Sequence, residues 1–369
     1  MNILSLELQN YRNYRELKWE LCPGINLLYG DNAQGKTNAL EAICLCATSK
    51  SHRGTKDREL IRFGEEEAHI KVMVEKRGVP CRLDVHLKKN RTKGIAVNGV
   101  PIRRVAEMFG ILHVVFFSPE DLSIIKDSPA ERRKFMDMEL CQLDRIYAHN
   151  LIQYNKVIVQ RNKLLKELDE RPDLYDTLDI WDEQLAAYGI PLIQSRQAFL
   201  RDLNDLVQEI HLSLSGGREQ AELSYAPNVE AADLKQILAR ERVRDRKART
   251  TLTGPHRDDL IFWVNGIDVR RFGSQGQQRT AALSLKLAEI EIVKRIIQDT
   301  PVLLLDDVLS ELDRSRQKQL LQRISHIQTV ITCTGLDDFV QHCFQIDRVF
   351  RVEDGQVIGG IHERETAGI

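Results

Sequence analysis

"INLLYGDNAQGKTN", residues 25–38, decides the fold, because a short apolar run leads directly into a glycine-rich turn. Its residues 30–37 match the pattern G-x-x-x-x-G-K-[ST]. The glycines let backbone N–H groups wrap phosphate oxygens, and the positive end of the following helix points at the same anion. Lys36 adds charge beside the β and γ phosphates, and the Thr37 hydroxyl is a ligand for Mg²⁺. The predicted nucleotide-binding residues are Gly30, Asp31, Asn32, Ala33, Gln34, Gly35, Lys36 and Thr37.

A second stretch, "VLLLDD" at residues 302–307, supplies the expected acidic partner. Four apolar residues indicate a buried strand whose carboxyl end presents its carboxylates at the ligand-binding edge of a parallel sheet. We expect Asp306 to hold Mg²⁺ together with Thr37. We expect Asp307 to polarise the attacking water as a general base. Lys36, Asp306 and Asp307 are therefore the predicted catalytic residues.

A third stretch, "RFGSQGQQRT" at residues 271–280, precedes a long amphipathic helix. Free N–H donors at such a helix start bind anions. The stretch resembles the signature motif of ABC-type ATPases, which binds the γ-phosphate held by the other subunit. By itself it is equally typical of a flexible turn that caps a helix. The residues predicted to act in trans are Ser274, Gln275, Gly276 and Gln277. "SELD" at 310–313 resembles the D-loop, with Asp313 as its acidic residue.

Composition sets broader limits on the 369-residue chain. Net charge is −1, so an argument for nucleic-acid binding has to rest on local basic patches. No apolar run approaches 18 residues, and the N-terminus lacks the pattern of a secretory signal. Seven cysteines without a CxxC pair argue against a zinc site or a disulfide framework. We therefore expect a reduced, cytoplasmic protein that does not enter a membrane.

The organisation changes twice along the chain. Alternating apolar residues predict strands near both ends, whereas residues 128–210 repeat apolar positions at steps of three and four. We expect one domain at 1–120 and 250–369 and an inserted helical segment at 121–249. The insertion is either an antiparallel helical hairpin with a coiled-coil seam or a compact helical subdomain, and the pattern favours neither.

Five stretches together resemble the RecF family of bacterial recombination-repair ATPases, and the resemblance spans the whole chain. They are "GDNAQGKTN", "SPAERRKFMD", "TGPHRDDL", "GSQGQQRT" and "LLLDDVLSELDRSR". The resemblance implies an α/β fold: an ABC-type ATPase head of the P-loop NTPase class, with a mixed sheet, an antiparallel β subdomain and a short helical arm. It also places Arg12, in "NYRNY", where related repair ATPases contact nucleotide phosphate.

The same resemblance implies the activity. It implies ATP and Mg²⁺ as cofactors, an ATP-dependent homodimer, and binding to double-stranded and gapped DNA at single-strand junctions. It further implies slow, DNA-stimulated ATP hydrolysis and recruitment of RecR, so that RecA loads onto gapped DNA.

Three departures from the wider ABC pattern predict slow turnover. Thr332-Cys333-Thr334 stands where many ABC proteins carry a switch histidine. No Q-loop glutamine is evident near "FFSPEDL", although Glu120 or Asp121 could substitute. Asp307 stands where glutamate is usual, and its side chain is one methylene shorter. We therefore expect a switch rather than a pump.

Basic residues are the candidates for DNA contacts. Lys88, Lys89 and Arg91 lie in "LKKNRTKG", and Arg132 and Arg133 fall in the first turn of a predicted helix. The helix macrodipole disfavours cations there, so an anion such as a DNA phosphate would explain them. The alternatives are a solvated charged face or pairing with nearby carboxylates. Separately, Arg53 in "SKSHRGTKDR" is a candidate sensor of phosphate or of a partner.

Two other functions compete with DNA repair. One is the soluble ATPase subunit of an ABC transporter, although the insertion separates loop and signature by about 240 residues. The other is a P-loop small-molecule kinase, which would leave "GSQGQQ" and "SELD" unexplained. Co-sedimentation with gapped DNA in the presence of ATP would distinguish the DNA-repair function from both of these alternatives.

Overall fold

The computed structural model describes residues 1–335 and 346–361. Its contacts divide the chain into two compact units: residues 1–121 with 289 onward, and residues 122–288. In the described part of the chain, no helix combines the length and the apolar character needed to span a membrane.

The first unit contains two six-stranded sheets. The antiparallel sheet, in the order β2-β1-β4-β5-β6-β7, contains β1 (Asn2–Tyr11), β2 (Tyr14–Glu20), β4 (Glu67–Lys76), β5 (Val79–Lys88), β6 (Arg91–Val97) and β7 (Val100–Pro101). The mixed sheet, in the order β15-β14-β3-β13-β12-β8, contains β3 (Ile25–Tyr29), β8 (Val114–Phe117), β12 (Val302–Asp306), β13 (Thr329–Cys333), β14 (Arg348–Glu353) and β15 (Gln356–Ile361). This pairing of a mixed sheet with an antiparallel one confirms the predicted fold class.

The parallel part of the mixed sheet positions the nucleotide loop. Neighbouring parallel strands β3, β13 and β12 end at one edge, because Leu28 pairs with Thr332 and Thr332 pairs with Asp306. All five residues of β12 are buried, which matches the apolar run that predicted it. The loop after β3 and the acidic pair after β12 therefore meet at the carboxyl edge.

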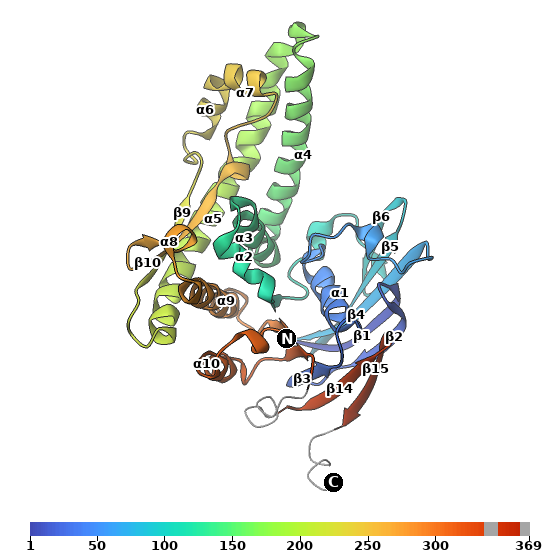
Figure 1. Ribbon diagram of the computed structural model, residues 1–369. Coiled ribbons are helices and arrows are strands. Elements are labelled where there is room, and N and C mark those ends of the chain that lie inside the picture. Colours follow the sequence, from blue (N-terminus) through green and yellow to red (C-terminus); the bar gives the residue numbers. More distant parts are fainter. Residues whose placement is uncertain (336–345, 362–369) are drawn as a thin grey trace. The chain divides into compact units, whose positions relative to one another are not determined.

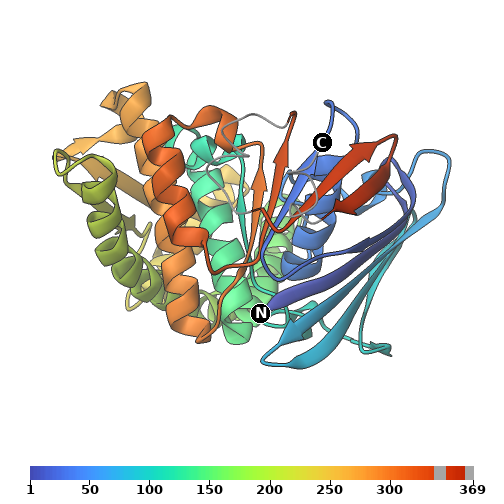
Figure 2. The ribbon, with the colours of Figure 1, turned by 90° about the horizontal axis from the view of Figure 1, so that it is seen from below.

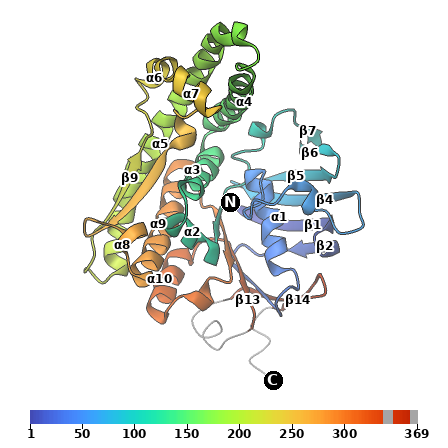
Figure 3. The ribbon, with the colours of Figure 1, turned by 45° about the horizontal axis from the view of Figure 1, so that its top comes forward.

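Helix α1 (Lys36–Thr48) follows the loop and is buried along most of its length. It packs against β4 and β5 of the antiparallel sheet and against β8, β12 and β13 of the mixed sheet. Figure 3 shows α1 beside the strands of the antiparallel sheet. At another edge of this unit β15 contacts β2, so the C-terminal strands in red lie beside the N-terminal strands in blue (Figure 2). The first unit also contains α10 (Arg314–Ile324).

The second unit is mostly helical. Its helices are α2 (Leu122–Lys126), α3 (Pro129–Leu143), α4 (Arg145–Glu167), α5 (Leu178–Leu214), α6 (Leu234–Arg240), α7 (Arg242–Ala248) and α8 (Val269–Phe272), followed by the start of α9 (Gln275–Ile297). Helices α4 and α5 run side by side (Figure 1). Since α5 has 37 residues, it is about 55 Å long. The pair forms a helical hairpin, and α3, α6 and β9 pack on it as well.

One sequence-based boundary needs correction, and the helical repeat over residues 128–210 is divided. Helix α3 ends before Asp144, which leaves helical geometry and caps α4 by accepting a bond from the Ile146 N–H. Residues 250–288 were expected with the head, but they fold with the helical unit. The reason is a three-stranded sheet in which β10 (Asp259–Val264) pairs with β9 (Ala221–Ala226) and with β11 (Ile267–Asp268).

The second unit carries a charged core. Arg161, which interrupts the predicted apolar seam, is fully buried and donates to Asp182 at 2.7 Å and to Asp245 at 2.6 Å. Arg196 is buried too and donates to Asp258 of the "GPHRDD" motif at 2.9 Å. Burial of such charges is costly unless each is paired. These pairs therefore explain why polar residues stand at seam and motif positions.

Candidate nucleotide-binding site

The loop between β3 and α1 has a backbone that requires glycine at two positions. Gly30 has φ of 153° and Gly35 has φ of 116°. A Cβ on Gly35 would lie 2.4 Å from Asn13 Nδ2, and one on Gly30 would lie 2.4 Å from the Val352 carbonyl oxygen. Both the dihedral angles and the lack of space exclude larger residues. The glycine spacing in the sequence therefore reflects close packing of the loop against strand β14 and against the turn between β1 and β2.

Lys36 begins α1, and its side chain reaches back over the loop. The ammonium group donates to the carbonyl oxygens of Gly30 at 2.6 Å and Asp31 at 2.8 Å. Burial lowers the pKa of Lys36, and the carboxylates of Asp307 and Asp306 act in the opposite direction. The side chain is thus held where the pattern predicts a phosphate-binding cation.

Thr37 and Asp306 are brought together across 269 residues of sequence. The Thr37 hydroxyl donates to Asp306 Oδ1 at 2.9 Å. The Thr332 hydroxyl, on the neighbouring strand β13, donates to the same oxygen at 2.7 Å. A hydroxyl and a carboxylate oxygen are the donor set that Mg²⁺ prefers, so these two residues fit the predicted ion.

Asp307 follows at a left-handed backbone position, with φ of 55°. Its N–H donates to the Thr332 hydroxyl at 3.0 Å, and the Ser310 hydroxyl donates to its carbonyl oxygen at 2.8 Å. Burial raises the pKa of Asp307, and the adjacent Asp306 carboxylate raises it further, while Lys36 acts to lower it. A raised pKa suits a residue that accepts a proton from water.

A cavity of about 170 Å³ opens between these groups. Most of the loop lines it, together with Asp306 and Asp307. Arg53, Thr332 and Thr334 line it as well, and the role of Arg53 as a sensor of phosphate or of a partner stays a prediction. The two threonines stand in the segment where a switch histidine was sought, and Thr332 orients both acidic residues through its hydroxyl.

Arg12 is held by a carboxylate. Its guanidinium donates to both Glu41 oxygens, at 2.9 and 3.0 Å, and to the Thr55 hydroxyl at 3.2 Å. Burial of Glu41 acts to raise its pKa, but hydrogen bonds from Arg12 and Ser51 outweigh it and lower that pKa. Arg12 thus anchors α1 and does not line the cavity. Its contact with a nucleotide phosphate stays a prediction.

Two residues that the motif patterns do not predict hold the loop in place. Asn13, next to Arg12, donates from Nδ2 to the Gln34 carbonyl oxygen at 2.8 Å and accepts from Asn38 Nδ2 at 2.8 Å. The Tyr14 hydroxyl donates to the Gly35 carbonyl oxygen at 3.0 Å. Asn13 and Tyr14 therefore fix the carboxyl end of the loop and the first turn of α1. "NYRNY" carried the signal, but only its arginine was singled out.

The signature stretch lies in the second unit, at the start of α9. Ser274 N donates to Gln277 Oε1 at 3.0 Å, and Gln277 N donates to the Ser274 hydroxyl at 3.2 Å. This reciprocal pair is a capping box. Ser274, Gln275 and Gly276 are exposed, so their outer surfaces are accessible. The stretch caps its helix, and its action on a partner's nucleotide stays a prediction.

Two acidic candidates near the sheet edge have local roles. Asp313 caps α10 by accepting from Arg316 N at 3.0 Å, and it also pairs with the Arg316 guanidinium at 3.0 Å. Asp121 accepts from Ser118 N at 2.7 Å, while neither it nor Glu120 lines the cavity. The proposed D-loop and Q-loop roles stay predictions.

The structure corrects the predicted DNA contact of Arg132, whereas that of the half-buried Arg133 stays a prediction. Arg132 is only 4% exposed and donates to both oxygens of Asp259, at 2.6 and 3.1 Å. Arg133 donates to the Asp258 carbonyl oxygen at 2.7 Å. Cations in this first helical turn are therefore offset by groups of the same unit. Because Arg132 is buried, a DNA phosphate cannot reach its guanidinium group.

The other basic candidates lie around the β5–β6 hairpin. Lys88 is 3.4 Å from a Glu67 oxygen, and Lys89 donates to Glu66 at 2.7 Å. Arg91 is exposed at the start of β6. Exposed ion pairs contribute little energy, so these lysines can exchange partners readily. This hairpin keeps its place as the predicted DNA-facing patch.

Comparisons with known proteins match one family along nearly the whole chain. Residues 2–357 match the family model described as "RecF/RecN/SMC N terminal domain". The chain is 57% identical to the DNA replication and repair protein RecF of Agathobacter rectalis, covering 97% of this chain and 99% of that one. It is 56% identical to RecF of Lachnoclostridium phytofermentans, covering 98% and 100%.

Solved structures extend the agreement to three dimensions. A structure of the recombination mediator protein RecF with ATPrS, in the RecFOR pathway, superposes with a TM-score of 0.90 at 38% identity, covering 97% of this chain and 98% of that one. The Smc head domain from Pyrococcus furiosus shares the fold alone, at 16% identity, a TM-score of 0.57 and coverage of 99% and 97%. The chain therefore belongs to the RecF family of SMC-like ATPases.

Proposed function

We propose that this protein is an ATP-dependent DNA-binding protein of recombinational repair. ATP drives two copies to dimerise and to clamp DNA at gaps and at junctions of single and double strands. The complex then helps to load the RecA recombinase, with RecR as the direct partner. The names of the relatives support repair and replication, and one related structure is placed in the RecFOR pathway.

A single hydrogen bond carries the ATP-binding part of the proposal. The Thr37 hydroxyl and the Asp306 carboxylate meet at 2.9 Å beside a cavity lined by the glycine-rich loop. Thr37 and Asp306 would hold Mg²⁺, which when bound would neutralise phosphate charge. Related RecF structures with ATP and ATPrS support the same ligand for this chain.

Hydrolysis is proposed to be slow and to serve as a switch. Asp307 is the group that would accept a proton from the attacking water, and Lys36 would stabilise the transferred charge. The Asp307 side chain follows a left-handed backbone position that Thr332 and Ser310 restrain. The short side chain of Asp307 supports a low rate of ATP hydrolysis. DNA would raise that rate.

Dimerisation is proposed to complete each site. The exposed Ser274–Gly276 segment would offer the N-terminal N–H groups of α9 to the γ-phosphate held by the other copy. A segment that acts in this way has to be accessible in the isolated chain, and this one is. Both sites would then depend on two copies and two nucleotides.

Binding to gapped duplex DNA tests the proposal against its competitors. The wild-type chain should bind gapped DNA in ATP, and Lys36→Ala should abolish this nucleotide dependence. Arg91→Ala should lower affinity and reduce the salt slope by about 1, as expected for one lost phosphate contact. Arg201→Ala, an exposed arginine on α5, is the matched control. DNA binding that ignores ATP, or that survives unchanged without Lys36, would reject the proposal.

A further inference from the structure

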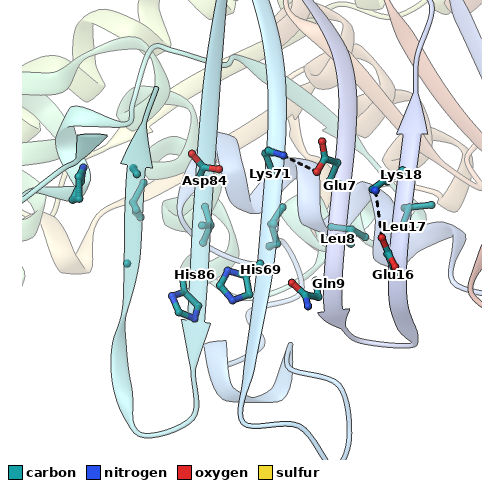
Figure 4. A pocket seen from close by; sticks show the side chains of 16 residues that line it. Glu7, Leu8, Gln9, Glu16, Leu17, Lys18, His69, Lys71, Asp84 and His86 are labelled. Atoms are coloured by element: carbon teal, nitrogen blue, oxygen red, sulfur yellow. Dashed lines mark hydrogen bonds and ion pairs between the residues drawn. The ribbon is translucent and has the colours of Figure 1, made fainter. Parts of the chain in front are cut away.

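The outer face of the antiparallel sheet carries a cavity of about 530 Å³ that the proposed ATPase does not use. Cross-strand pairing arranges its polar side chains in rows. One row runs from Glu16 through Gln9, His69 and His86 to Gly94. Figure 4 shows His69 and His86 side by side, with Gln9 next to His69. Two imidazoles therefore share one open surface in the middle of a six-stranded sheet.

Glu67 joins the two histidines. It lies two residues before His69 on β4, so both side chains point to the same face. Its Oε2 is 3.0 Å from His86 Nε2, and its Oε1 is 3.8 Å from His69 Nε2. The two imidazole rings stack with centroids 3.9 Å apart and planes inclined by 22°. One nitrogen or oxygen from each of the three residues lies within 4.8 Å of the others.

We propose that Glu67, His69 and His86 form a binding site for a divalent transition-metal ion of the Zn²⁺ class. Imidazole nitrogens and a carboxylate oxygen are ligands that Zn²⁺ takes at about 2.0–2.2 Å. Ligand atoms around a tetrahedral ion then lie about 3.3 Å apart, so small side-chain rotations complete the site. The three side chains are 49%, 45% and 32% exposed, which leaves them room to rotate.

The sheet supplies the rigidity that such a site needs. His69 and His86 are direct partners in the register of β4 and β5, and both strands are flanked by others. Their backbones are therefore fixed before an ion arrives. Gly94 is the partner of His86 on β6, and it has no side chain to cover the imidazole. Three protein ligands leave a fourth position for water.

The charges around the cluster permit binding. Lys88 lies 3.4 Å from Glu67 Oε2, but an exposed ion pair of this kind contributes little and yields to a divalent ion. The cysteine pattern led to the expectation of no zinc site, and this proposal departs from it because its ligands are imidazoles and a carboxylate; the six described cysteines are free thiols. Cys343 lies outside the described residues.

Zinc titration of the untagged, nucleotide-free chain in competition with a chromophoric chelator tests the site. We expect one Zn²⁺ per chain, with affinity reduced at least tenfold in His69→Ala and in His86→Ala, because even an outer partner of a metal ligand is worth that much. Glu67→Gln should weaken binding as well. Glu7→Gln, which changes a carboxylate of the same face in the next row, is the matched control and should bind zinc like the wild type.

Two further measurements make the test decisive. Zinc should raise the melting temperature of the wild type and of Glu7→Gln, but not of the double variant His69→Ala/His86→Ala. Cobalt should bind without the charge-transfer absorption of a thiolate ligand. The proposal is overturned if the chain binds no zinc at micromolar concentrations, if the double variant binds zinc as tightly as the wild type, or if the cobalt spectrum reports thiolate ligation.

Discussion

Replacing Thr332 by valine should disable the acidic edge of the site while keeping its shape. The Thr332 side chain is 1% exposed and has nearly the volume of valine. Its hydroxyl donates to Asp306 Oδ1 at 2.7 Å and accepts from Asp307 N at 3.0 Å. Thr332→Val removes both bonds at once, while Asp306 keeps the bond from Thr37.

The magnitude follows from these contacts. A hydrogen bond to a charged acceptor contributes about 1.5–3 kcal/mol, and leaving the Asp307 N–H unpaired costs about 1–3 kcal/mol. Because the two effects share one hydroxyl, we expect the free energy of unfolding to fall by about 2–4 kcal/mol. Loss of an outer partner of a metal ligand should raise the Mg²⁺ concentration for half-maximal ATP hydrolysis by about 10–100-fold.

Two assays check this expectation. Urea unfolding measures stability, and steady-state ATPase measurements over a Mg²⁺ titration measure the functional effect. Thr332→Ser is the matched control, because it keeps the hydroxyl and loses one methyl group, at a cost of about 1 kcal/mol. A valine variant with the wild-type Mg²⁺ midpoint and wild-type stability would refute the role given to this hydroxyl.

Three further perturbations have expected outcomes of their own. Arg12→Ala should lower the free energy of unfolding by about 2–4 kcal/mol at neutral pH, since it leaves the buried Glu41 carboxylate without its guanidinium partner. Because the pKa of Glu41 is lowered, the loss should shrink in urea unfolding as the pH falls through that pKa. Asp307→Asn should abolish hydrolysis. The wild-type carboxylate has a folded pKa above its unfolded value, so its ionisation destabilises the fold as the pH rises; the variant should therefore gain stability relative to wild type at neutral pH, and lose that gain in acid. Equal pH profiles would refute the raised pKa that burial and the Asp306 carboxylate give Asp307. Gly35→Ala should weaken ATP binding about tenfold through backbone strain at φ of 116°, and calorimetry that finds wild-type affinity would contradict this.

The sequence alone predicts those parts of the nucleotide site whose residues lie within one short motif or directly after one apolar run. The glycine spacing and the apolar runs placed Lys36 and Thr37 after β3 and Asp306 after β12. A parallel sheet then brings the ends of its strands together without further information. These residues meet as predicted, within one cavity.

The sequence alone does not predict which side chains contact each other across long separations in the chain. Asn13 clamps the loop through Gln34, and Thr332 orients Asp306 from the neighbouring strand. Both contacts depend on strand register and on which turn packs beside which, and neither follows from local periodicity. In the sequence, Thr332 stands out only because it lies in the segment where many ABC proteins carry a switch histidine.

Arg132 illustrates a sound premise with an incomplete conclusion. Cations in a first helical turn do require a compensating anion. The compensation comes from Asp259, 127 residues later in the chain, and not from DNA. The domain boundary failed for a related reason, since the pairing of β9 with β10 joins residues 250–288 to the helical unit. A β-ladder between distant segments has no signature in either segment alone.

The central claim is that a bound triphosphate joins two copies, each lending its exposed Ser274–Gly276 segment to the other's nucleotide. Sedimentation of the chain with saturating non-hydrolysable ATP analogue, with ADP, and with neither measures this most directly. The account predicts a dimer only with the analogue, and a monomer for Ser274→Arg, which should still bind nucleotide but obstruct the partner. A wild-type chain that stays monomeric with the analogue, even when duplex DNA is present, would contradict it.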